Sequence, residues 1–239
     1  MSTPTAAIAI VCKVPKAGTS KTRLIPRLGA ERAAVLSRAF LDDVAATIER
    51  VGAAVGARGY AVCSPADDAI ELATFLPPSF GYAVHTHPVL GAVLDAATAD
   101  LLGHGHDCAV LVNGDSPTLP DSILVDAVAT LRRPGERVVF GPALDGGYTL
   151  VGLKRREPAI FTDIPWSTSA VMRHSRDRAA AIGLPAVEVA PWYDVDDAES
   201  FAWLVAEFAG RPPAGLTRSG APAPATRAVL AAAGFVDAG

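Results

Sequence analysis

Short apolar runs alternate with longer amphipathic segments along the whole chain. The first apolar run, AAIAIVC (6–12), has no charged position, so it predicts a strand that is buried on both faces of a sheet. Runs of the same kind predict six further strands, over residues 59–63, 82–86, 108–112, 137–142, 147–153 and 186–190.

Apolar residues at helical spacing predict the helices between these strands. In residues 30–51 they recur at Ala33, Leu36, Phe40 and Val44, which lie on one face of a helix. Similar patterns predict helices over 67–76, 90–102, 121–131, 168–182, 199–208 and 225–233.

The alternation of strand and helix predicts an α/β fold, with a mainly parallel sheet and helices on both faces. Strands 137–142 and 147–153 follow one another closely, which predicts a small antiparallel insertion. Residues 211–224, RPPAGLTRSGAPAP, have the composition of a linker or mobile tail. We therefore expect one domain over residues 1–210 and a Pro/Ala/Gly-rich tail with a short helix over 211–239.

Composition limits the classes of partner. The chain has 239 residues, half of them apolar, and a net charge of −4, so it can bury a large core but has no overall basic surface for nucleic acid or anionic membranes. The N-terminal run is too short for a membrane span and resembles a first strand more than a signal peptide. Three distant cysteines without a C-x-x-C motif fit reduced thiols, which predicts a cytoplasmic protein.

Polar residues after the first strand form a basic loop. Ligands of an open α/β sheet bind beyond the carboxyl ends of its strands, where this loop would lie. Lys13, Lys21 and Arg23 could hold a polyphosphate, and Gly18 would let backbone amides approach it. The loop lacks the spacing of a Walker A motif, and the alternative is a solvated basic loop.

Two acidic stretches predict a metal site. Asp115 follows the fourth strand in Asn113-Gly114-Asp115, where a carboxylate can bind Mg²⁺ or Mn²⁺; the alternative is a turn cap. Asp194 and Asp196 follow the last strand and would lie on one side of an extended chain, so they could complete the site. Alternatively, Asp196 or Asp197 caps the next helix.

Two further stretches are candidates for ligand contact. In GPALDGGY (141–148), the glycines either make a hairpin turn or, with Asp145 and Tyr148, contact a ligand. In IPWSTS (164–169), Ser167 or Thr168 is expected to cap a helix and Trp166 to pack in the core; the alternative is a substrate contact.

These motifs, in this order, resemble the DUF2064 family, also called the radical-SAM/selenodomain-associated transferase 1 family. It belongs to the nucleotide-diphospho-sugar transferase (GT-A) superfamily. The resemblance covers about residues 6–205, and GPALDGGYTLVGL and IPWSTS are its most specific parts. The sequence departs from the family pattern at Ala92 and Val93, which stand where family members carry an acid and a base.

The resemblance implies a Rossmann-like GT-A fold and assigns roles to the candidate residues. Asp115 would bind Mg²⁺ or Mn²⁺, with Asp194 or Asp196 as the second acidic ligand. The resemblance makes Asp115, Asp145, Lys21 and Arg23 the expected catalytic residues. Those expected to contact the nucleotide or the acceptor are Lys13, Gly18, Lys21, Arg23, Asn113, Gly146, Gly147 and Tyr148.

The function predicted from the sequence is a metal-dependent transferase that uses a nucleotide-activated donor and a small-molecule acceptor. Family resemblance favours glycosyl transfer from an NDP-sugar. The alternatives are a nucleotidylyltransferase that releases pyrophosphate from an NTP, as in molybdenum-cofactor or phospholactate guanylyltransferases, and a nucleotide-binding protein without turnover. Neither nucleic acid nor a membrane is an expected partner, and a homodimer is a base-rate expectation.

Overall fold

Strand β1 (Ala6–Val11) lies inside the sheet and pairs in parallel with β2 (Ala57–Cys63) and with β4 (Ala109–Asn113). This arrangement comes from a computed structural model, which describes residues 5–64 and 66–237. Residues 6–10 of β1 are fully buried, as expected for a strand covered on both faces.

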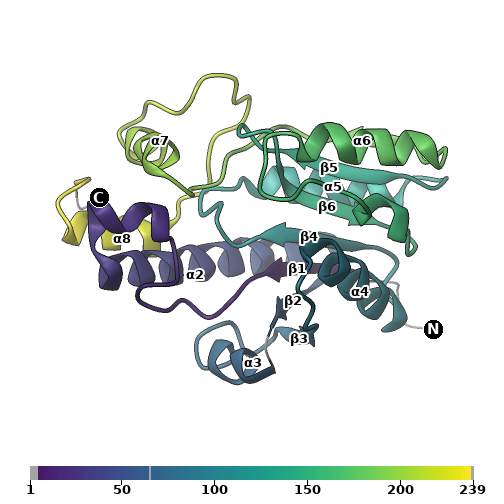
Figure 1. Ribbon diagram of the computed structural model, residues 1–239, viewed down its shortest axis with the longest axis horizontal. Helices are drawn as coiled ribbons and strands as arrows, with labels where there is room; N and C mark the ends of the chain where they lie inside the picture. The colour runs from purple at the N-terminus through teal and green to yellow at the C-terminus, as the bar shows by residue number, and fades with distance from the viewer. Residues whose placement is uncertain (1–4, 65, 238–239) are drawn as a thin grey trace.

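Seven strands form one sheet in the order β3-β2-β1-β4-β6-β5-β7 (Figure 1). The remaining strands are β3 (Gly81–Val84), β5 (Val138–Pro142), β6 (Tyr148–Leu153) and β7 (Ala186–Glu188). Within the described residues, β6 alone runs antiparallel, between β4 and β5. The predicted α/β class is therefore confirmed, and the antiparallel element is a strand inside the sheet.

Helices cover both faces of the sheet. On one face lie α2 (Ala30–Val55) and α5 (Asp121–Arg132), and on the other α4 (Leu90–Gly103) and α6 (Val171–Ala181). The shorter elements and the last two helices are η1 (Thr22–Leu24), α1 (Ile25–Leu28), α3 (Ala66–Leu72), η2 (Pro158–Phe161), α7 (Ala198–Phe208) and α8 (Pro224–Ala232).

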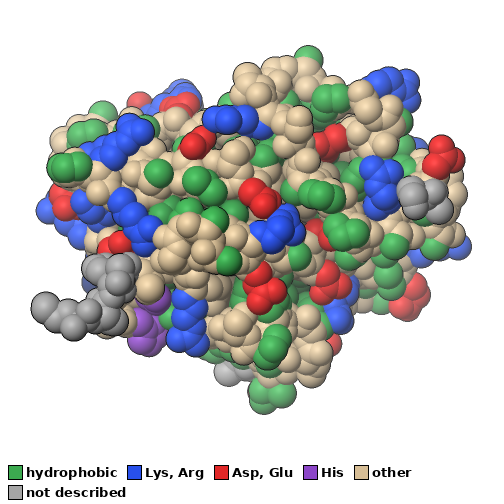
Figure 2. Space-filling model, turned by 180° about the vertical axis from the view of Figure 1, so that it is seen from behind, with side chains coloured by type: hydrophobic (Ala, Val, Ile, Leu, Met, Phe, Trp, Pro, Cys, Tyr) green, Lys and Arg blue, Asp and Glu red, His purple; other side chains and the backbone are tan. Residues whose placement is uncertain are grey.

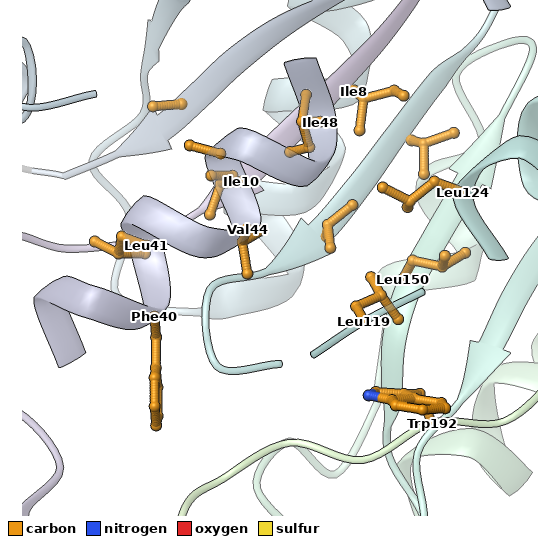
Figure 3. Close-up of a cluster of buried hydrophobic side chains, with 14 of the residues drawn as sticks. Ile8, Ile10, Phe40, Leu41, Val44, Ile48, Leu119, Leu124, Leu150 and Trp192 are labelled. Atoms are coloured by element: carbon orange, nitrogen blue, oxygen red, sulfur yellow. The ribbon is translucent and has the colours of Figure 1, made fainter. Parts of the chain in front are cut away.

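The alternation of β1 side chains divides the core into two layers. Ile8 and Ile10 pack on the α2 face with Phe40 and Val44, as Figure 3 shows, while Ala7 and Ala9 face α4. Burying a large apolar side chain contributes about 1.5–3 kcal/mol to folding. This two-sided packing fixes where the strands end, and therefore where the loops beyond them lie.

Several elements depart from their predicted bounds: α2 continues to Val55, whereas α3 ends at Leu72 and β3 at Val84, four and two residues earlier than expected. Helix α6 begins at Val171 instead of residue 168, because Ser167 has a left-handed backbone (φ 63°) and Thr168 donates its hydroxyl to the carbonyl of Pro165 at 2.7 Å. Neither Ser167 nor Thr168 is its N-cap, which is Ala170. Strand β7 ends at Glu188, two residues earlier than expected.

The C-terminal segment packs against the rest of the chain. Asp43 of α2 accepts hydrogen bonds from the backbone N–H groups of Ala225 (3.0 Å) and Thr226 (2.7 Å) at the start of α8, which lies beside α2 (Figure 1). Upstream, the N–H of Ala221 donates to the carbonyl of Thr118 at 2.9 Å. The division into domains at residue 210 stays a prediction.

Acidic and basic side chains are interspersed on the face of the molecule seen in Figure 2. Among the described residues, no helix is long and apolar enough to cross a membrane.

Candidate functional site

A cavity of about 980 Å³ lies beyond the carboxyl ends of β1, β2 and β4. Strand β1 leads into the basic loop, β2 ends at Cys63, and β4 leads to Asp115. Six predicted site residues line this cavity: Lys13, Lys21, Arg23, Asp115, Asp145 and Asp196.

Lys21 joins two of the predicted acidic residues. Its Nζ lies 2.7 Å from Oδ1 of Asp115 and 2.7 Å from Oδ1 of Asp196. The Lys21 side chain is 6% exposed, whereas those of Asp115 and Asp196 are 40% and 46% exposed. The fold thus brings together three residues from the first quarter, the middle and the last quarter of the chain.

Local backbone contacts position the two carboxylates. Gly114 allows β4 to end against α2, because a Cβ there would lie 2.6 Å from a methyl group of Leu41. The N–H of Val195 donates to the carbonyl of Asp115 at 2.9 Å, which joins the two acidic loops. The N–H of Asp196 donates to the hydroxyl of Ser200 at 3.0 Å.

Asp197, and not Asp196, is the cap of helix α7. Its Oδ1 accepts from the N–H groups of Glu199 and Ser200, and Ser200 completes a capping box. Asp196 is therefore free of the capping role and directs its carboxylate to Lys21. The capping interpretation therefore applies to Asp197, and metal binding by Asp196 stays a prediction.

Burial and the neighbouring charges shift the pKa values of Asp194 and Lys21. Burial, followed by the charges of Asp145, Asp196 and Asp115, raises the pKa of Asp194 to about 7. Burial by itself would lower the pKa of Lys21, but the charges and hydrogen bonds of Asp115 and Asp196 outweigh it and raise that pKa. The ammonium is therefore held in its charged form.

The basic loop folds back on itself before reaching the cavity. The N–H of Ser20 donates to the carbonyl of Lys16 at 2.9 Å, and the N–H of Lys16 donates to the hydroxyl of Ser20 at 2.8 Å. This turn places Lys21 and Arg23 on the cavity wall with Lys13, whereas Gly18 is exposed and does not line the cavity.

The 143–147 turn packs against the IPWSTS stretch. Asp145 is exposed on the cavity wall, and its Oδ1 accepts from the N–H of Gly147 at 2.7 Å. Gly146 (φ 91°) lies so close to the neighbouring loop that a Cβ would be 2.3 Å from the carbonyl oxygen of Ser169. The glycines therefore form a tight turn that places Asp145 on the cavity wall, and ligand contact by this stretch stays a prediction.

Several predicted residues do not line the cavity: Gly18, Asn113, Gly146, Gly147, Tyr148 and Asp194. Tyr148 packs its ring between Phe140 and Trp166, and burial raises its pKa. Within the described residues, its hydroxyl and the side-chain oxygen of Asn113 are buried without a hydrogen-bond partner.

The cavity also has two walls beyond the predicted catalytic, nucleotide-binding and metal-binding residues. Ser167, Thr168 and Ser169 contribute hydroxyl groups, and Pro88, Leu90 and Val93 contribute an apolar wall. The run of three hydroxyl residues before a helix was a signal for the first wall. Val93, one of the two positions expected to depart from the family pattern, lies in this apolar wall.

The carboxylates do not fit a divalent metal ion as they are arranged. Among the described residues, no group of three or more His, Cys, Asp or Glu side chains is placed to hold one. The position between Asp115 and Asp196 is taken by the ammonium of Lys21.

Residues 47–168 match the family described as "Uncharacterized protein conserved in bacteria (DUF2064)". This match covers about half of the chain, including β2–β6 and both the Asp115 loop and the 143–147 turn. No curated protein sequence matches the chain.

Solved structures share the fold over nearly the whole chain. One, from Desulfovibrio desulfuricans G20 and provisionally named a nucleotide-diphospho-sugar transferase, is 26% identical and covers 98% of this chain and 97% of its own, with a TM-score of 0.80. A CMP:2-keto-3-deoxy-manno-octonic acid synthetase complexed with CTP is 12% identical, covers 86% and 99%, and has a TM-score of 0.56. Rv0371c from Mycobacterium tuberculosis H37Rv, complexed with manganese, is 16% identical, covers 84% and 97%, and has a TM-score of 0.50.

Proposed function

The chain belongs to the DUF2064 family, and from this premise we propose that it transfers a group from a nucleotide-activated donor to a small-molecule acceptor. The leading reaction is glycosyl transfer from an NDP-sugar. The name of the Desulfovibrio protein supports this choice.

One observation carries the proposal: cations and carboxylates from distant parts of the chain line a single cavity at the carboxyl ends of parallel strands. This edge is where an open α/β sheet binds its ligands. The volume, about 980 Å³, is at the upper end of the range for ligand pockets, which suits a donor and an acceptor bound together.

The cavity residues can perform each part of a glycosyl transfer. The acceptor hydroxyl oxygen attacks the anomeric carbon, and the bond from that carbon to the donor phosphate oxygen breaks, with its electron pair leaving on the nucleoside diphosphate. Lys13 and Arg23 donate hydrogen bonds to that phosphate and stabilise its developing charge. Asp145, on the opposite loop, accepts the hydroxyl proton.

Nucleotidyl transfer is the alternative reaction. An acceptor phosphate would attack the α-phosphorus of an NTP, and pyrophosphate would leave against the basic loop. The positive charge of that loop favours this alternative, because a triphosphate carries more charge than a nucleoside diphosphate sugar. Dependence on Mg²⁺ or Mn²⁺ stays a prediction for both reactions.

A product assay distinguishes these functions. The protein is incubated with panels of NDP-sugars, NTPs and acceptors, with and without Mg²⁺ or Mn²⁺, and nucleotides are separated by anion exchange. NDP release indicates glycosyl transfer, and pyrophosphate release indicates nucleotidyl transfer. Binding in isothermal titration without either product indicates a nucleotide-binding protein, and failure to bind any nucleotide contradicts the whole proposal.

Asp145→Asn tests the assigned base. It keeps an oxygen that can accept from the N–H of Gly147, so the turn is expected to survive. NDP release should fall about 100-fold or more, as expected for loss of a general base, while donor affinity stays unchanged. An unchanged rate would remove Asp145 from the mechanism.

A further inference from the structure

The site between Asp115 and Asp196 holds a cation that belongs to the chain itself. Two carboxylate oxygens, one from each loop, contact the same ammonium at 2.7 Å. These are the oxygens that the sequence assigns to a divalent metal ion. In the described part of the chain, no three His, Cys, Asp or Glu side chains are placed together to hold a metal ion.

The backbone at Lys21 is built for this contact. Lys21 has left-handed dihedrals (φ 49°, ψ 46°), which cost a residue with a side chain about 1–2 kcal/mol. Its Nζ also lies 5.5 Å from the centre of the Phe40 ring, and Phe40 is fully buried. A strained backbone and a buried charge persist only where surrounding contacts compensate, and here the two carboxylates provide that compensation.

Lys13 gives the contrast. It lines the same cavity and has the same charge, but it is exposed, and no ion pair involves it in the described part of the chain. Lys13 can therefore bind a phosphate without first breaking an ion pair. Lys21 is available only if it leaves the carboxylates.

We propose that Lys21 and a divalent cation bind Asp115 and Asp196 in mutually exclusive fashion, so that the chain's own ammonium guards the site against free metal ions. Two positive charges in contact with the same oxygens repel each other strongly. Donor phosphates offer Lys21 another partner, so the nucleotide and the metal ion favour the same rearrangement. This last step rests on the proposed function, but the exchange of lysine for metal does not require turnover.

The exchange predicts a gain of metal affinity when Lys21 is removed. If a binding site is open in only a fraction of the molecules, the apparent Kd of its ligand equals the intrinsic Kd divided by that fraction. Mn²⁺ binding, measured without nucleotide by the electron paramagnetic resonance signal of the free ion, should therefore be at least about 10-fold tighter in Lys21→Met than in the wild type. Asp115→Asn added to Lys21→Met should abolish that gain.

Lys13→Met is the matched control. It removes one positive charge from the same cavity, so it reports how much Mn²⁺ affinity changes through long-range electrostatics alone. Equal affinities in the two single variants, or a wild type that already binds Mn²⁺ as tightly as Lys21→Met, would overturn the proposal.

Labelling of the wild-type protein keeps the test decisive if Lys21→Met does not fold. An amine-acylating reagent followed by mass spectrometry reports each lysine, with Lys154 as the internal reference. Saturating Mn²⁺ should speed acylation of Lys21 relative to Lys154, and an unchanged ratio would refute the exchange. Exchange without any transferase product would support this inference and contradict the proposed function. Transferase products without exchange would support the proposed function and contradict this inference.

Discussion

The backbone N–H of Val195 donates a hydrogen bond to the carbonyl of Asp115 at 2.9 Å, which joins the loop after β4 to the chain that leads into α7. The bond uses no side-chain atom. The two acidic loops are therefore expected to stay together when the Asp115 carboxylate is changed.

Asp115→Asn should separate function from stability at this position. The amide oxygen can still accept a hydrogen bond from Lys21, and Asp196 still balances its charge, so the thermal midpoint should fall by no more than about 3 °C. The Mg²⁺-dependent part of the nucleotide affinity should disappear in isothermal titration, because a neutral amide is a poor ligand for a hard cation. A large fall in the midpoint would instead identify Asp115 as a structural cap.

Arg23→Ala should weaken nucleotide binding by about 10- to 100-fold, as expected for loss of a charge-assisted hydrogen bond to phosphate. The loss should shrink at high salt, because Arg23 is exposed on the cavity wall. Arg32→Ala is the control, since Arg32 is also exposed but does not line the cavity. Equal losses in both variants would indicate a general effect of net charge.

Local pattern was sufficient to predict most of the fold. The periodicity of residues 30–51 located α2, because its apolar stripe packs on the sheet along its length. The start of α6 was wrong because a left-handed residue, Ser167, interrupts a sequence that would otherwise continue the helix. The 143–147 turn also packs against this stretch at Ser169, a tertiary contact that local propensity does not register.

The sequence predicted part of the cavity lining but not the pairings between its side chains. Strand ends located Asp115 and the basic loop at one edge, because parallel strands share that edge. The contact between Lys21 and Asp196 joins positions 175 residues apart and depends on how the last loop crosses the sheet. Alternation along an extended chain placed Asp194 with Asp196, but Asp196 lines the cavity and Asp194 does not.

Gly146→Ala should destabilise the protein more than the backbone conformation alone explains. Both Gly146 and Gly105 have a left-handed φ, at 91° and 88°. A Cβ on Gly146 would collide with the carbonyl of Ser169, whereas one on Gly105 would meet nothing within 4 Å. Gly105→Ala should therefore cost about 1–2 kcal/mol in unfolding free energy, and Gly146→Ala clearly more. Equal costs in chemical denaturation would mean that the two loops do not pack together.

Glu207 should make stability fall as the pH rises. Burial raises its pKa above the ordinary 4.5, although Tyr193 and Thr118 donate hydrogen bonds to its carboxylate. As the pH rises from 4.5 to the raised value, the unfolded chain releases the proton first, so it binds fewer protons than the folded chain and folding loses stability. Glu207→Gln cannot titrate, so its unfolding free energy relative to the wild type should increase across that window and then level off. Glu199→Gln, at an exposed position of the same helix, controls for loss of a charge, and a parallel pH profile in the two variants would contradict the prediction.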